Sequence, residues 1–152
     1  MLFDFRTALQ IFVPLVLSLS VHEWAHAWVA WKCGDNTAYH QGRVTMNPVA
    51  HMELIGTVVL PLLASFVALS NPTLAGFIIG WGRPVPVNAA NLRRPRVDET
   101  LVTIAGPTMN FILAFALIAV LRLGGREAWF SPEEFELVRL FASQAAIAIS
   151  QS

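Results

Sequence analysis

The stretch that decides the fold is "SLSVHEWAHAWVAWK", residues 18–32, which directly follows the apolar run "ALQIFVPLVL" at residues 8–17. Together they exceed the length of about 20 residues that a helix needs to cross a bilayer. The second half of this segment nevertheless contains His22, Glu23 and His26 within five residues. Each ionisable group inside a membrane span costs about 2.5 kcal/mol or more unless it is paired or functional. The stretch therefore predicts a membrane helix with a polar site.

The composition of the whole chain agrees with a membrane protein. Its 152 residues suit a single domain, and they are 55% hydrophobic and 13% charged, whereas ordinary globular domains are about 25% charged. Ten basic residues balance ten acidic ones, so no overall charge favours nucleic acid and we expect no nucleic-acid partner. The single cysteine, Cys33, excludes an intrachain disulfide and a cysteine-based zinc cluster. We expect one membrane-embedded domain over residues 1–152.

The apolar segments predict an all-α, polytopic bundle of transmembrane helices. The spans are expected at about residues 8–31, 54–82 and 101–123, with a partial fourth from about residue 135. Gly106-Pro107 predicts the start of the third span, because proline is tolerated in the first turn of a helix. After the first span, the polar stretch "YHQGRVTM" predicts a short β-hairpin. The basic residues are almost evenly divided between the two sides, so they do not decide the orientation.

His22-Glu23-Trp24-Ala25-His26 has the pattern H-E-x-x-H. On a helix, the two histidines lie about 40° apart around the axis and roughly 6 Å along it, so both imidazoles can bind one metal ion. Glu23 can reach a metal-bound water, whose pKa the metal lowers to about 7, and can take its proton during attack on a carbonyl. The pattern predicts Zn²⁺ bound by His22 and His26, with Glu23 as the catalytic base; a structural or ion-pathway role is the alternative.

Four segments, in order, extend the pattern over roughly residues 15–120: "HEWAHAWVAWKCGD", "GRVTMNPVAHMELIGTVVLP", "GWGRPVPVN" and "AGPTMNFILA". They resemble the site-2 proteases, the zinc-dependent intramembrane metalloproteases of peptidase family M50. The resemblance implies an endopeptidase that cleaves peptide bonds in or near transmembrane segments, in the lipid of a bacterial or archaeal cell membrane. It also implies that Asn110, in "GPTMN", lies near the active site and binds substrate backbone; an interhelical hydrogen bond is the alternative.

The resemblance implies a third zinc ligand, an aspartate in an "LDG" segment on a later helix, and the chain contains no "LDG". We therefore expect a domain truncated at its C-terminal side, whose continuation contains Asn and Pro followed by Asp-Gly. Other ligand types near the expected span boundaries are His51, Glu53, Asp98 and Glu99. Two further functions stay open: an inactive protein that binds helices without cleaving them, and a transporter whose polar pathway includes the H-E-x-x-H residues. The sequence does not predict the oligomeric state.

Overall fold

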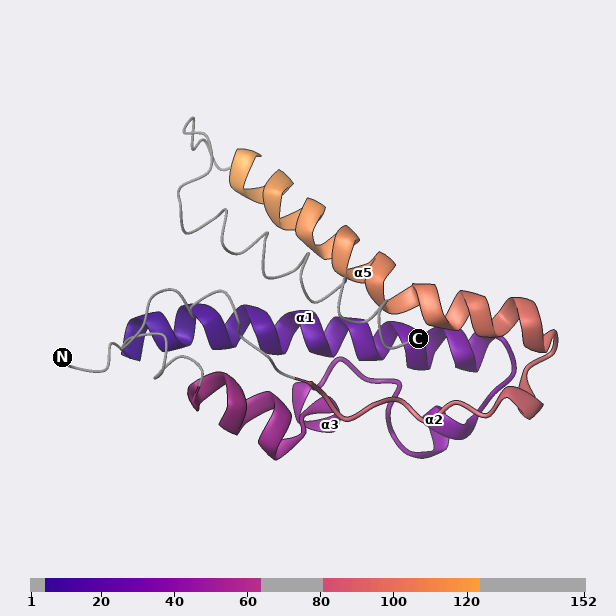
Figure 1. Ribbon diagram of the computed structural model, residues 1–152. Coiled ribbons are helices and arrows are strands. Elements are labelled where there is room, and N and C mark those ends of the chain that lie inside the picture. Colours follow the sequence, from indigo (N-terminus) through magenta and orange to yellow (C-terminus); the bar gives the residue numbers. More distant parts are fainter. Residues whose placement is uncertain (1–4, 64–80, 124–152) are drawn as a thin grey trace.

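The computed structural model describes residues 5–63 and 81–123, shown as ribbon in Figure 1. The elements are α1 (Phe5–Lys32), α2 (Thr37–His40), α3 (Pro48–His51), η1 (Leu54–Val59), η3 (Ala89–Asn91) and α5 (Pro95–Leu123). Within these ranges there is no β-strand, so the predicted all-α class is confirmed for the described part of the chain.

Helix α1 is 28 residues long and contains the H-E-x-x-H pattern in its second half. The helix ends at Lys32, and two residues later Gly34 has a left-handed φ of 111°. The N–H of Gly34 donates to Trp31 O (3.2 Å) and the N–H of Asp35 donates to Ala30 O (2.9 Å). This is the Schellman pattern, which satisfies the last carbonyls of a helix and reverses the chain. The reversal turns Asp35 back into the protein, where its side chain is fully buried.

Helix α5 begins at Pro95, several residues before the predicted start of the third span. Pro95 is tolerated there because an N–H group in the first turn of a helix has no acceptor within the helix, so its absence in proline breaks no hydrogen bond. The buried Asp98 accepts a hydrogen bond from Arg94 N (2.8 Å) at the same end. The prediction that Gly106-Pro107 starts the helix is therefore wrong, since Pro107 lies inside it.

Helices α1 and α5 pack against each other in opposite directions. His26 of α1 contacts Val102, and His22, one turn earlier, contacts Asn110 further along α5. Figure 1 shows the first half of α5 lying along the second half of α1 and its second half diverging. A proline inside a helix removes a hydrogen bond and bends the axis, and Pro107 is the only proline interior to α5.

The connection after α1 does not form the predicted hairpin. Residues 39–46 are the end of α2 followed by turns and bends. Their hydrogen bonds are local, with Arg43 N donating to Ala38 O (2.9 Å) and Gly42, at φ 67°, turning the chain. The Arg43 guanidinium also donates to Ala50 O at the end of α3. A strand would lose these contacts, so the turn is held by packing that a local pattern of residues does not reveal.

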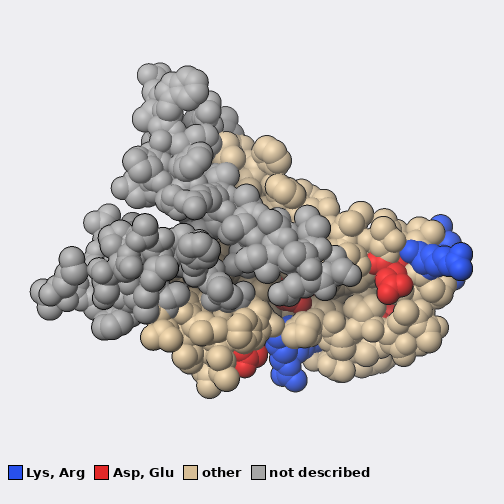
Figure 2. Space-filling model, viewed as in Figure 1, with Lys and Arg blue, Asp and Glu red and all other residues tan. Residues whose placement is uncertain are grey.

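By length and composition, one helix of the described residues could cross a membrane, namely Pro95–Val120, with a mean hydropathy of 2.0. It contains most of the third predicted span. The first predicted span lies inside α1, and the second begins as the short apolar helix Leu54–Leu63. The rest of the second span and the fourth segment lie outside the described residues. Figure 2 shows charged side chains at the end where α1 stops and α5 starts, and a second group of them near the middle of the lower edge.

Candidate metal site

Helix α1 brings the side chains of His22 and His26 together, as the sequence predicts. Their Nε2 atoms are 3.0 Å apart, and the ring centroids are separated by 4.6 Å. His22 is buried, with 7% of its surface exposed. The spacing of four residues on a regular helix is the cause of this approach.

Helix α5 contacts the other nitrogen of each ring. The Nδ1–H of His26 donates to Val102 O at 2.6 Å. The Nδ1 of His22 lies 3.3 Å from Nδ2 of Asn110, whose side chain is almost fully buried. Metal-binding histidines usually have such a partner on the nitrogen that does not bind the metal, because the partner fixes the ring and its tautomer.

The orientation of the Asn110 amide determines which nitrogen of His22 is free. As placed, its NH₂ group donates to Nδ1 of His22, so the ring proton lies on Nε2. Turned by 180°, its Oδ1 accepts the Nδ1–H of His22 and leaves the Nε2 lone pair free for a metal. As placed, Oδ1 of Asn110 is buried and has no hydrogen-bond partner among the described residues. A buried acceptor without a donor is costly, so the site has a polar atom in need of a partner.

Gly106 leaves space beside the two imidazoles. A Cβ atom there would collide with Nε2 of His26 and would lie 2.6 Å from Nε2 of His22. Real Cβ contacts are not that short, so only glycine lets the backbone of α5 approach the histidine pair here. Gly106 is thus a packing residue against the Nε2 atoms of His22 and His26.

The two histidines fit a zinc ion as a pair. Two nitrogen ligands at about 2.0–2.1 Å from a tetrahedral zinc are about 3.3 Å apart, and the observed separation of the Nε2 atoms is 3.0 Å. A small opening of the pair would therefore bring both Nε2 atoms to ligand distance from one ion. In residues 5–63 and 81–123, however, no group of three or more His, Cys, Asp or Glu side chains could hold a metal.

The other ligand types considered from the sequence have different positions. His51 is fully buried, with Nε2 at 2.7 Å from Thr45 O. Glu53 caps η1, where its carboxylate accepts from Gly56 N at 2.6 Å. Asp98 is held by Arg94 at the start of α5, and Glu99 is exposed. In residues 5–63 and 81–123, none of these four side chains forms a group of three ligand types with the histidine pair.

Glu23 is held by a different part of the protein. Its Oε2 accepts a hydrogen bond from Val85 N at 3.2 Å, in the extended segment that precedes η3. A buried arginine, Arg43, lies close enough to interact electrostatically with Glu23; burial and repulsion from Arg83 lower the pKa of Arg43, and attraction to Glu23 opposes this. Glu23 and the two histidines thus have contacts with separate parts of the chain.

Sequence reasoning identified His22, Glu23, His26 and Asn110, but it missed Val85, Val102 and the packing role of Gly106. Val85 and Val102 act through backbone atoms, which no side-chain motif reveals. One signal was available, because residues 102, 106 and 110 repeat the four-residue spacing of the histidines. That spacing places them on one face of a helix.

Comparison with known proteins agrees with the geometry. A sequence profile of peptidase family M50 matches residues 10–150. A Bacillus subtilis protein with the provisional name zinc metalloprotease YwhC is 45% identical over 103 residues, which are 68% of this chain and 41% of that protein. The Mycobacterium tuberculosis protein with the provisional name zinc metalloprotease Rip2 is 35% identical over 108 residues, or 71% of this chain and 38% of its own length.

The Rip2 protein of Mycolicibacterium smegmatis is 30% identical over 110 residues, with 70% of this chain and 38% of that protein aligned. The chain thus matches less than half the length of each of these relatives. No solved structure matches it. Since the family profile extends over nearly all of the sequence, the chain belongs to peptidase family M50.

Proposed function

We propose that this chain forms the metal-binding part of a zinc-dependent intramembrane endopeptidase, which hydrolyses peptide bonds in or near transmembrane segments. The observation on which the proposal depends is the pair of facing Nε2 atoms of His22 and His26, 3.0 Å apart, with Glu23 on the same helix. Membership of peptidase family M50 and relatives named as zinc metalloproteases support it.

In this proposal His22 and His26 are zinc ligands and Glu23 is the general base. A bound zinc supplies Lewis acidity, which acidifies water and polarises a carbonyl. Glu23 accepts the proton of the attacking water on its carboxylate. Two histidines fall short of the three protein ligands usual in catalytic zinc sites, so the proposal requires a third protein ligand in addition to the side chains that residues 5–63 and 81–123 bring to the pair.

Asn110 has two proposed contacts. Its amide, in the turned orientation, accepts the Nδ1–H of His22 through Oδ1. Its NH₂ group then takes the buried position where Oδ1 now has no partner, and it is available to a backbone carbonyl of the substrate. The unpartnered atom supports the interpretation of Asn110 as a substrate-binding residue.

We further propose that the chain is an integral, multi-pass protein of a bacterial or archaeal cell membrane. The span Pro95–Val120 supports this, with apolar side chains on its exposed surface: Phe111, Ile112, Phe115 and Val120. Apolar side chains on the outside of a helix suit contact with lipid. The proposed partners are membrane lipid and a transmembrane protein or peptide substrate.

The alternative is a protein that binds transmembrane helices without cleaving them. It is favoured by one observation, the absence of a third metal ligand beside the histidine pair in residues 5–63 and 81–123. A measurement of bound zinc distinguishes the two functions, because only the endopeptidase requires the metal.

The first test is the zinc content of the detergent-purified chain. We expect about one zinc per chain in the wild type, loss of zinc in His26→Ala, and retention in His40→Ala, because His40 is exposed and distant in the chain from the pair. A wild-type chain that binds no zinc would overturn the proposed site and favour the non-cleaving alternative.

The second test is Glu23→Gln, which keeps the shape of the side chain and removes the base. Since general-base catalysis contributes about 10²–10⁴-fold to a rate, cleavage of a transmembrane peptide should slow by about 10³-fold. The zinc content should stay at the wild-type level, because Glu23 is not a ligand. Cleavage at the wild-type rate would exclude Glu23 as the base.

A further inference from the structure

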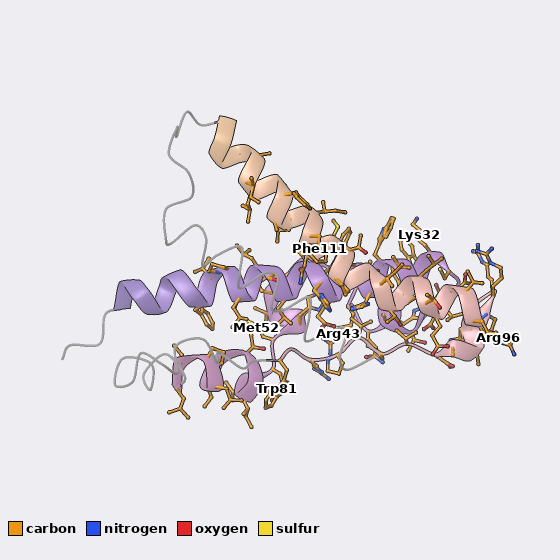
Figure 3. The ribbon with its side chains drawn as sticks, turned by 45° about the horizontal axis from the view of Figure 1, so that its top comes forward. Lys32, Arg43, Met52, Trp81, Arg96 and Phe111 are labelled. Atoms are coloured by element: carbon orange, nitrogen blue, oxygen red, sulfur yellow. The ribbon has the colours of Figure 1, made fainter. Side chains whose placement is uncertain are left out.

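Residues 81–86, here called the brace, form an extended segment on the side of α1 opposite to α5. Figure 3 shows Trp81 on that side together with Arg43 and Met52, whereas Phe111 of α5 lies on the other side. The brace lies close to α1, since a Cβ at Gly82 would be 2.7 Å from Cδ1 of Leu19. Leu19 precedes Glu23 by one helical turn.

Alternate backbone N–H groups of the brace donate to the body of the protein. Trp81 N donates to Gly56 O (3.2 Å) and Arg83 N donates to His51 O (2.8 Å). The third donor in this series is Val85 N, and its acceptor is Oε2 of Glu23 (3.2 Å). Alternate residues of an extended chain point to the same side, so one regular conformation serves all three bonds.

Two prolines make Val85 the only donor in the middle of this segment. Pro84 and Pro86 have no N–H, and each restricts φ to about −65° and favours an extended conformation in the residue before it. The sequence Pro84-Val85-Pro86 is therefore stiff before it meets Glu23. Little conformational entropy is lost when the Val85 N–H binds the carboxylate.

The segment that follows the brace is anchored at Asn88 and Asn91 by Asp35, which is fully buried. Its Oδ2 accepts from Asn88 N at 2.7 Å, and its Oδ1 accepts from the Asn91 amide at 2.9 Å. The same Oδ1 accepts from the backbone N–H and the hydroxyl of Thr37, at 3.0 and 2.5 Å. Asp35 thus ties the turn after α1 to the residues that directly follow the brace.

We propose that the brace positions the Glu23 carboxylate for proton transfer, with the Val85 N–H as the contact and Asp35 as a more distant positioning residue. One carboxylate oxygen, Oε2, is held by the peptide N–H, so the other, Oε1, is left to accept the proton of the attacking water. The catalytic meaning of this contact rests on the proposed function, but the contact itself does not.

The contact is tested without any activity, by amide hydrogen exchange of the full chain in detergent. Because Pro84 and Pro86 have no amide hydrogen, the Val85 amide is well separated from other exchanging sites along the brace. Glu23→Ala should speed its exchange at least tenfold and leave the Trp81 and Arg83 amides unchanged. His26→Ala, one turn further along α1, should leave Val85 protected. Equal Val85 exchange in the wild type and in Glu23→Ala would overturn the proposal.

The catalytic role is tested with Val85→Pro, matched by Val87→Pro. The first removes the N–H that binds Glu23. The second removes the N–H of an exposed residue outside the brace, which has no hydrogen-bond acceptor among residues 5–63 and 81–123. Since misplacing a catalytic group by about 1 Å can cost 10²-fold, Val85→Pro should lower kcat about 10–100-fold with KM within twofold and zinc unchanged. Val87→Pro should match the wild type.

An unchanged kcat in Val85→Pro, or a loss of zinc in that variant, would overturn a positioning role. An equal loss in both proline variants would do the same, because it would indicate a general effect on the segment. If the wild-type chain cleaves no peptide, the proposed function fails, and the exchange experiment still decides whether the brace holds Glu23.

Discussion

The two sides of α1 hold the candidate site in different ways. On one side α5, a long helix, contacts the imidazoles through Val102 O and Asn110 and leaves space at Gly106. On the other side the brace, an extended segment, holds Glu23 through a backbone N–H. The two histidines are therefore oriented by the packing of two helices, and Glu23 by a loop. The comparison teaches that metal binding and proton transfer should respond to different substitutions.

Gly106→Ala should have the largest effect on the α5 side. The new Cβ would collide with the ring nitrogens of His26 and His22, and overpacking of this kind costs about 1–3 kcal/mol. We expect the affinity for zinc to fall about 100-fold, measured by competition with a chelator. In an open helix the same change would instead stabilise by about 1 kcal/mol.

The matched control is Ile104→Ala, on the exposed side of the same helix, which should bind zinc like the wild type. Normal zinc affinity in Gly106→Ala would show that α5 does not approach the histidine pair as closely as described. The comparison between the two sides of α1 would then lose its basis.

Asn110→Ala should weaken zinc binding less, by about tenfold. Removing the partner of a metal-binding histidine typically costs 10–100-fold in affinity, and the His22 ring itself would remain. Thr108→Ala, an exposed change two residues away, is the control. The same chelator competition measures the effect. An unchanged affinity in Asn110→Ala would leave only the substrate contact as the role of this residue.

Asp35→Asn should have the smallest effect on zinc and a clear effect on stability. It replaces a buried carboxylate that accepts hydrogen bonds from Thr37, Asn88 and Asn91. Because hydrogen bonds to charged groups contribute about 1.5–3 kcal/mol, the free energy of unfolding should fall by about 2 kcal/mol. Denaturation in detergent measures it, with the exposed Glu99→Gln as control. A stability equal to the wild type would exclude Asp35 as an anchor of the brace.

The difference in unfolding free energy between the wild type and Asp35→Asn should depend on pH. Burial raises the pKa of Asp35, but hydrogen bonds from Thr37, Asn88 and Asn91 outweigh burial and hold that pKa below its usual value of 3.8. A depressed pKa in the folded state means that the stabilisation is complete above the unfolded pKa and is lost as pH falls through the folded pKa. The difference between wild type and Asp35→Asn should be constant from pH 7 to about pH 4 and should shrink below that.

Much of the candidate site could be predicted because its spacing is local. His22 and His26 face each other whenever residues 18–32 are helical, and this helix follows from a long run of apolar residues. Asn110 was identified by its place in a family-like segment. The predicted start of the third span at Gly106-Pro107 was wrong. A Gly-Pro pair is typical of a helix start, but Pro95 and Asp98 begin this helix earlier. The hairpin at residues 39–46 is not confirmed, because Arg43 bonds to Ala38 O and Ala50 O, in the short helices on either side, and holds that segment in turns.

The sequence by itself determined the helical class, the paired imidazoles and the acidic residue beside them, because a helix turns neighbours in the chain into neighbours in space. Only the tertiary structure decided what holds them. Val102 O, the close approach of the backbone at Gly106 and the Val85 N–H are backbone features, and each meets a residue of α1 that is 62 or more positions away in the sequence. Backbone groups are the same in every residue, so their use in a site depends on how distant segments pack and not on a motif.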